Sequence, residues 1–248
     1  MNAIFITVRS ASTRLPNKAT LGIGDKATIE YVIQNAKRSK YADKIILCTT
    51  TLDQDNVLCR LAKQNGIDYY RGSVEDKLER WHGAATHYGV DFFVTADGDD
   101  LFCSEELMDL AFEQRGRNNS HFIQGGDIIC GSFTYGISTD ALKKVCEIKD
   151  SDDTEMMWVY FTDTGLFDVE ILERVPSCYA RSDIRMTLDY KDDFDFFKKV
   201  IDYFDGHEFN TRDVINFIDE NPEVKEINFY LQDAWAQNQK NKTNMRLK

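Results

Sequence analysis

Several residue types and patterns are scarce in this sequence of 248 residues, and each scarcity excludes a class of protein. With 3 prolines, 14 glycines and 12% aromatic residues, the chain is neither disordered nor of low complexity. No apolar run approaches the roughly 20 residues that a membrane-spanning helix needs. The N-terminus has no basic stretch ahead of its apolar residues, so we expect no signal peptide and a cytoplasmic protein.

Cysteine and histidine patterns that bind metals are also missing. The six cysteines are scattered with no CxxC pair, and the four histidines include no HExxH spacing. In a chain without a signal peptide, such cysteines are expected to be reduced and mostly buried as small hydrophobic residues. We therefore expect no zinc site.

Positive charges are outnumbered by negative ones over the whole chain but are concentrated at the N-terminus. The net charge of −12 argues against a nucleic acid partner, because a phosphate backbone requires a basic surface. Residues 1–40, however, contain seven basic side chains and two acidic ones. A basic segment in an acidic protein predicts a small polyanionic ligand that binds locally to that segment.

Strand and helix patterns alternate through the first half of the chain. Each predicted strand is followed by an amphipathic helical stripe, and Asp25, Ser73 and Ser104 are predicted to cap three of these helices. This alternation predicts βαβ units and an α/β fold with a mainly parallel sheet. The predicted strands are Ala3–Val8, Lys44–Thr50, Asp68–Arg71 and Phe92–Ala96.

The second half is less regular. Residues 121–137 are rich in glycine and are expected to form strands or loops, and residues 165–174 are expected to add another strand. Asp192–Tyr203 has a helical stripe of apolar residues, and Thr211 is predicted to cap a further helix. No linker rich in Gly, Ser or Pro divides the chain, which favours one domain.

The basic segment is centred on the loop Val8–Lys18, which reads VRSASTRLPNK and follows the first buried strand. Cations, hydroxyls and the amides of small residues are the groups that bind a triphosphate. The Walker A pattern is absent, and a solvated basic loop is the alternative interpretation. The candidate ligands are the cations Arg9, Arg14 and Lys18 and the hydroxyls Ser10, Ser12 and Thr13.

An acidic group, Asp97, Asp99 and Asp100, follows the fourth predicted strand. Clustered carboxylates suit a hard cation such as Mg²⁺, although acids that favour a helix dipole are the alternative interpretation. An EF-hand is excluded because Leu101 stands where the next oxygen ligand should be. Ligands of parallel sheets bind at the carboxyl ends of strands, so the acidic and basic loops should share one edge of the sheet.

Four short motifs follow one another along residues 3–204. They are Arg9-x-x-Ser12-Thr13-Arg14-Leu15-Pro16-x-Lys18, Arg71-Gly72-Ser73-x-x-Asp76-x-Leu78-x-Arg80, Gly98-Asp99 and Thr187-Leu188-Asp189-x-x-x-Asp193. In this order they resemble the SpsF-like cytidylyltransferases of spore-coat polysaccharide biosynthesis, relatives of the CMP-sialate and CMP-KDO synthetases. The resemblance implies a Rossmann-related, GT-A-like nucleotidyltransferase sandwich.

The resemblance also implies a reaction and roles for residues. An acceptor oxygen would attack the α-phosphorus of CTP, with GTP as the alternative nucleotide, and pyrophosphate would leave. Asp99 and Asp189 would hold Mg²⁺, and Arg14, Lys18 and Asp99 would be catalytic. The implied nucleotide-binding residues are Arg9, Ser10, Ser12, Thr13, Arg14, Lys18, Arg71 and Ser73.

The acceptor half departs from the family pattern. Residues 132–135 stand where the family has an acidic LDVE segment, and Glu155-Met156 replaces a Glu-His pair. Phe133, Tyr135 and Glu155 are predicted to line the acceptor pocket. With fewer carboxylates to repel it, we expect a small anionic acceptor, a sugar or another compound that bears a phosphate or phosphonate, in surface polysaccharide or glycoconjugate synthesis.

The predicted domain spans residues 1–236, with a nucleotide-binding half (1–115), an acceptor-binding half (116–236) and a frayed polar tail (237–248). A homodimer is left open. Two other functions are also left open at this point. One is a GT-A glycosyltransferase that uses Asp97-Gly98-Asp99 to bind a nucleotide-sugar, and the other is a non-catalytic nucleotide-binding relative.

Overall fold

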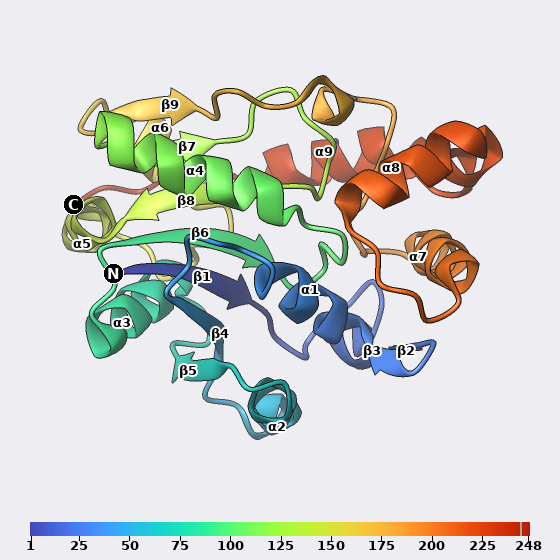
Figure 1. Ribbon diagram of the computed structural model, residues 1–248. Coiled ribbons are helices and arrows are strands. Elements are labelled where there is room, and N and C mark those ends of the chain that lie inside the picture. The colour runs from blue at the N-terminus through green and yellow to red at the C-terminus, as the bar shows by residue number, and fades with distance from the viewer. Residues whose placement is uncertain (244) are drawn as a thin grey trace.

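The strands of the first half form the centre and one side of a seven-stranded sheet, in the order β5-β4-β1-β6-β8-β7-β9 (Figure 1). The computed structural model describes residues 1–243 and 245–248. β1 (Asn2–Thr7) pairs in parallel with β4 (Lys44–Thr50) on one side and with β6 (Phe92–Asp97) on the other. β5 (Asp68–Gly72) extends the parallel sheet beyond β4.

The second half of the chain completes the sheet. β8 (Tyr135–Ser138) is antiparallel to both β6 and β7 (Phe122–Gln124), and β9 (Val169–Ile171) pairs with β7 in parallel. The mainly parallel sheet predicted from the sequence is therefore confirmed.

Helices cover both faces of the sheet (Figure 1). β1 shows why, since Ile4 and Ile6 pack in one apolar cluster with α1, α4 and α7, while Ala3 and Phe5 pack in the other with α3 and α5. Within the described ranges, none of the helices combines the length and apolar character needed to cross a bilayer. The helices are α1 (Thr28–Ala36), α2 (Asn56–Gln64), α3 (Lys77–Tyr88), α4 (Glu105–Asn118), α5 (Thr139–Ile148), α6 (Val159–Thr162), α7 (Lys191–Phe204), α8 (Thr211–Glu220) and α9 (Gln232–Lys242).

Of two predicted helix caps, one lies at the predicted residue and the other lies three residues away. The Ser104 hydroxyl accepts a hydrogen bond from the Leu107 N–H (3.3 Å) and caps α4 as predicted. For α3 the prediction is wrong by three residues, because Asp76 accepts from the Glu79 N–H (3.0 Å) and is the cap. Ser73 instead accepts from the Asp76 N–H (3.1 Å), so its hydroxyl closes the turn before the helix.

Two further caps also differ from the prediction. Asp25 lies in the turn of a short ribbon that joins β2 (Gly22–Ile23) to β3 (Lys26–Ala27). The start of α1 is stabilised instead by Glu30, whose carboxylate accepts from the Ala27 N–H (2.8 Å). Thr211 is the first residue of α8, and the residue before it is the cap.

The tail predicted from residue 237 begins inside a helix. α9 continues to Lys242, with no buried side chain. Beyond it, the Lys248 N–H donates to the Ile148 carbonyl (2.9 Å), and the Asp150 N–H donates to the Arg246 carbonyl (2.8 Å). The C-terminal end is therefore attached to the end of α5. A helix without an apolar stripe gives no periodic signal, which is why the pattern analysis missed it.

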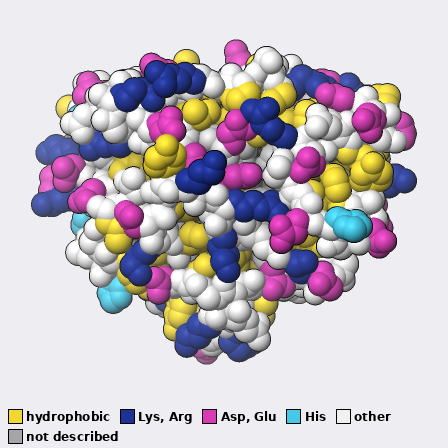
Figure 2. Space-filling model, in the orientation of Figure 1, with side chains coloured by type: hydrophobic (Ala, Val, Ile, Leu, Met, Phe, Trp, Pro, Cys, Tyr) yellow, Lys and Arg dark blue, Asp and Glu magenta, His cyan; other side chains and the backbone are white. Residues whose placement is uncertain are grey.

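Charged side chains of both signs are interspersed with apolar ones over the face seen in Figure 2. All six cysteines are free thiols. Three of them are buried, namely Cys48, Cys59 and Cys103, and the other three are partly exposed.

Candidate active site

A cleft of about 1260 Å³ opens at the carboxyl ends of β1 and β6. Its walls come from the loops that follow β1, β5 and β6, from residues 124–135 and from α9. The basic loop and the acidic loop therefore lie on one edge of the sheet, as the sequence predicts.

The two loops meet through a lysine. The Lys18 Nζ donates to Asp99 Oδ2 (2.5 Å) and to Asp189 Oδ1 (2.9 Å), and the Arg14 Nη2 donates to the same Asp189 oxygen (2.6 Å). The Lys18 side chain is 17% exposed and that of Asp189 is 3% exposed. Three segments that are far apart in the sequence thus converge on one buried charge cluster, which we call the central cluster (Arg14, Lys18, Asp99 and Asp189).

All members of this cluster whose pKa is shifted favour the charged form. Burial opposes the charge of Lys18, but Asp99 and Asp189 raise its pKa well above the ordinary value. Burial likewise opposes ionisation of Asp189, yet Lys18 and Arg14 keep its pKa below the ordinary value. Arg14, Lys18 and Asp189 therefore present full charges to a ligand at neutral pH.

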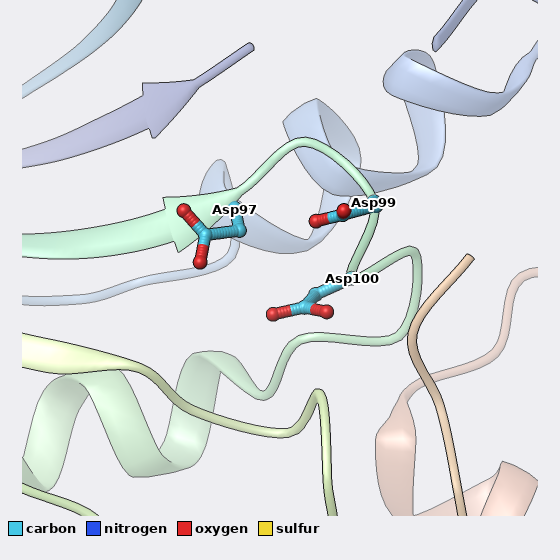
Figure 3. A group of neighbouring side chains, drawn as sticks. All are labelled: Asp97, Asp99 and Asp100. Atoms are coloured by element: carbon cyan, nitrogen blue, oxygen red, sulfur yellow. The ribbon is translucent and has the colours of Figure 1, made fainter. Parts of the chain in front are cut away.

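Asp97, Asp99 and Asp100 lie at the end of β6 and on the turn that follows, with their carboxylates directed toward one region (Figure 3). One oxygen from each lies within 4.8 Å of the others. Burial raises the pKa of Asp97 to about 6, and burial with the Asp99 charge raises that of Asp100 well above the ordinary value. Such crowding of oxygen ligands suits a hard divalent cation, which would relieve the repulsion.

The turn between these acids needs a glycine. A Cβ added to Gly98 would lie 2.6 Å from the Cβ of Val8, because the turn passes directly over the end of β1. This close approach places Asp99 beside the basic loop. The residue before Asp99 must therefore be a glycine, because a side chain there would collide with Val8.

Asp189 is positioned by a buried ion pair. The guanidinium of Arg185 donates to both carboxylate oxygens of Asp193 (2.9 and 3.2 Å). Asp193 Oδ2 in turn accepts from the N–H groups of Asp189 and Tyr190 (2.9 Å each) at the start of α7. Asp193 thus satisfies the first N–H groups of α7, and the Asp189 side chain is left to face Lys18.

The predicted acceptor residues Phe133, Tyr135 and Glu155 all line the cleft. Glu155 Oε2 accepts from the Arg9 Nη2 (3.0 Å), and its Oε1 lies 4.0 Å from the Lys242 Nζ of α9. We call these three charged residues the mouth cluster. Burial opposes ionisation of Glu155, but Arg9 lowers its pKa below the ordinary value.

Among the predicted nucleotide-binding residues, Ser12 and Thr13 also line the cleft. Ser10, Arg71 and Ser73 are not among the described lining residues. The Ser10 N–H donates to the buried carboxylate of Asp55 (2.7 Å), and its hydroxyl donates to a carbonyl of the loop after β4 (3.1 Å).

Arg71 is fully engaged in bracing the loop after β4. Its Nε donates to the Thr50 carbonyl (3.0 Å), its Nη1 to Asn56 Oδ1 (2.9 Å) and its Nη2 to the Leu52 carbonyl (2.9 Å). With three of its nitrogens engaged in this way, Arg71 is placed as a support of the loop.

Several residues that line the cleft had no role predicted from the sequence. Arg80 stood in a quoted motif, so a signal for it existed. The lining residues of α9 had none, because that helix lacks an apolar stripe. They are Gln232, Trp235, Asn238, Gln239 and Lys242.

The comparison with protein families decides the class of the protein. A family model described as cytidylyltransferase matches residues 3–235. The chain belongs to the cytidylyltransferase family. It is therefore a nucleotidyltransferase, which favours nucleotidyl transfer over the glycosyl-transfer alternative.

Individual relatives agree with this family assignment. The chain is 34% identical over 225 residues to the uncharacterised protein MJ1063 of Methanocaldococcus jannaschii. The matched region covers 90% of this chain and 92% of that protein. A solved cytidylyltransferase from Leptospira borgpetersenii superposes with a TM-score of 0.81 at 27% identity, over 90% of this chain and 95% of that one. A CMP:2-keto-3-deoxy-manno-octonic acid synthetase complexed with CTP shares the fold, with a TM-score of 0.62 at 12% identity over 82% of this chain and 98% of that one.

Proposed function

We propose that this cytidylyltransferase uses Mg²⁺ to transfer CMP from CTP to an oxygen of a small acceptor and releases pyrophosphate. The acceptor is a sugar or another anionic compound that bears a phosphate or phosphonate, and the enzyme is of the SpsF-like type that serves surface polysaccharide or glycoconjugate synthesis. The observation that carries the proposal is the central cluster, where two cations and two carboxylates converge at the carboxyl ends of the strands. The fold shared with a synthetase complexed with CTP supports the choice of nucleotide.

The reaction would form one bond and break one. The acceptor oxygen bonds to the α-phosphorus as the bond from that phosphorus to the bridging oxygen breaks, and the electron pair leaves with pyrophosphate. A hydroxyl acceptor loses its proton to solvent in this step, whereas an ionised phosphate or phosphonate oxygen has none to lose. Arg14 and Lys18 would donate to the pyrophosphate oxygens and stabilise their growing charge. Ser12 and Thr13, which line the same wall of the cleft, would offer further donors to the phosphates.

Asp99 and Asp189 fit a magnesium site by their chemistry. Both carboxylates contact the ammonium of Lys18, so the space between them favours positive charge. Carboxylate oxygens are the ligands that Mg²⁺ takes in proteins, and the bound ion would neutralise charge on the phosphate oxygens. Asp97 and Asp100 would add carboxylate oxygens nearby.

Ligand-induced stabilisation tests the proposal. We expect CTP with Mg²⁺ to raise the melting temperature more than GTP, UTP or ATP, since a ligand at a hundred times its Kd stabilises by about 2.7 kcal/mol. Pyrophosphate release from CTP with a panel of sugars, sugar phosphates and phosphonates would then identify the acceptor. Absence of any stabilisation by CTP, with or without Mg²⁺, would contradict the proposed nucleotide.

A further inference from the structure

Arg80 of α3 is a buried cation without an ionic partner. It is 5% exposed, yet it lines the cleft. Its Nη1 donates to the Ser73 carbonyl (2.7 Å), whereas its Nε is buried and bonds to no atom of the described chain. Across residues 1–243 and 245–248, no carboxylate lies within ion-pair distance of its guanidinium. Burial lowers the pKa of Arg80, and the charges of Asp55 and Asp76 offset that effect only in part.

A buried guanidinium with unpaired donors costs free energy, which indicates that a ligand supplies the missing acceptors. A buried donor without an acceptor costs about 1–3 kcal/mol, and more when the group is charged. Arg80 has two unpaired donors side by side, since Nε and Nη2 form one edge of the planar guanidinium and neither donates to a described residue. Of the two, Nε is the one that is fully buried. This edge matches a ligand that presents two adjacent hydrogen-bond acceptors.

The place of Arg80 along the sheet separates it from the phosphate-binding groups. The cleft extends from Val74, Lys77 and Arg80, which follow β5, across the centre at β1 and β6 to the walls after β7 and before β8. The central cluster occupies the middle, so a triphosphate bound there has the two ends of the cleft left for its base and for the acceptor. Phe133 and Tyr135 lie at the far end of the cleft, next to β8.

We infer that Arg80 recognises the base of the nucleotide and selects cytosine over uracil. The inference rests on the proposed function, which places the triphosphate at the central cluster. Cytosine offers O2 and N3 as two adjacent acceptors that match the edge of the guanidinium, in the way that arginine pairs with two acceptors of guanine in DNA. Uracil has a hydrogen on N3, so one donor of Arg80 would face another donor.

The same geometry explains the motif around Arg71 and Ser73. Arg71 holds the loop after β4 through two backbone carbonyls and one amide oxygen, so it supports the wall. The Ser73 carbonyl holds Nη1 of Arg80 and fixes which edge of the guanidinium is left unpaired. Arg71 and Ser73 therefore position Arg80, and Arg80 forms the hydrogen bonds to the base.

Binding titrations of three probes test the inference in the presence of Mg²⁺. The probes are CTP, UTP and inorganic triphosphate, and the proteins are the wild type, Arg80→Lys, Arg71→Lys and, as a matched exposed control on α2, Arg60→Lys. We expect Arg80→Lys to weaken CTP binding by about 10- to 100-fold and to reduce the preference for CTP over UTP by a similar factor. Triphosphate should bind this variant as it binds the wild type, and Arg60→Lys should change none of the three.

Other results would overturn the inference. An unchanged ratio of CTP to UTP affinity in Arg80→Lys would do so, as would an equal loss of CTP and triphosphate, which would place Arg80 on the phosphates. A loss of that ratio in Arg71→Lys alone would assign the base to Arg71. Should Arg80→Lys melt before the titration temperature, Arg80→Gln carries the same test, because its amide lacks the two adjacent donors and its oxygen can accept from the N3–H of uracil. If the wild type itself fails to bind CTP, the proposed function is overturned as well. If the wild type binds CTP but Arg80→Lys keeps the preference for CTP over UTP, only the role of Arg80 is overturned.

Discussion

The central cluster and the mouth cluster contain similar ion pairs but differ in burial. In the central cluster Asp189 is 3% exposed and is held from behind by the buried Arg185–Asp193 pair. In the mouth cluster the side chains of Arg9, Glu155 and Lys242 are 43%, 45% and 50% exposed. Charges at the centre are therefore fixed in place before any ligand binds, whereas charges at the mouth are screened and free to rearrange.

This difference in burial indicates that the two clusters have different roles in the cleft. Fixed charges stabilise a transition state well because they need no reorganisation during the reaction. The mouth cluster joins a residue of the basic loop to residues of the second half, including α9, the least buried helix. We therefore expect substitutions in the central cluster to affect the reaction itself, and substitutions at the mouth to affect the choice of acceptor.

The largest expected effect comes from the proposed metal ligands. Asp99→Asn should lower the rate of pyrophosphate release by about 10²- to 10³-fold while leaving the fold intact, because an amide is a poor ligand for Mg²⁺ and removes a full charge. Asp189→Asn should act in the same direction and less severely. Steady-state assays with varied Mg²⁺ would measure both.

An exposed acid provides the control for this pair of variants. Asp53→Asn, on the surface of the loop after β4, should retain full activity. Near-normal turnover of Asp99→Asn at saturating Mg²⁺ would remove Asp99 from the metal site.

The next effect concerns the cations of the central cluster. Lys18→Ala and Arg14→Ala should weaken CTP binding about 10- to 100-fold but CMP binding far less, since their charges are proposed to meet phosphates that CMP lacks. Calorimetric titration with both nucleotides would measure the difference. Equal losses for CTP and CMP would place these residues at the α-phosphate or away from the nucleotide.

The strands and the central cluster were the predictable part of the molecule. Lys44–Thr50 forms a strand with the predicted bounds because the short apolar run Ile45–Cys48, followed by two buried threonines, leaves few alternatives inside a sheet. Lys18 and Asp99 meet because parallel strands bring their carboxyl ends to one edge. Both results follow from rules that depend on local sequence and on topology.

The remainder could not be predicted because it depends on partners that are distant in the sequence. Arg71 bonds to backbone carbonyls, which every residue carries and no pattern marks. The cap of α3 moved from Ser73 to Asp76 because both residues can cap, and Thr154 in the second half donates to Asp76 (2.9 Å). α9 was missed because it has no buried side chain and no apolar stripe, so its sequence carries no helical period.

A smaller effect is expected at the acceptor. Phe133 and Tyr135 in place of two acids make this wall less repulsive to an anion, so sugar phosphates or phosphonates should be used at least about 10-fold better than KDO or sialic acid. Competition assays with the wild type, read as kcat/KM for each acceptor, would measure the preference. Efficient transfer of CMP to KDO or sialic acid would overturn the expectation of an unusual acceptor.

The smallest expected effect is on the free energy of unfolding, for which the exposed and the buried ion pairs can be compared directly. The pKa of Glu155 is lowered, so its pairing stabilises the fold above its ordinary pKa and is lost as the pH falls through the lowered value. Because the pair is exposed, Glu155→Gln should change the free energy of unfolding by less than about 1 kcal/mol at pH 7, and by less still in high salt.

The buried counterpart should behave differently. Asp193→Asn should cost about 3 kcal/mol, because it leaves the buried Arg185 guanidinium with only a longer ion pair, to Asp189 Oδ2 at 3.8 Å. Salt should hardly change that cost, because the site is buried. Urea denaturation of both variants at two salt concentrations would measure the contrast. If Glu155→Gln proved as destabilising as Asp193→Asn, the mouth cluster would be part of the rigid frame of the cleft, and the assignment of acceptor choice to it would fall.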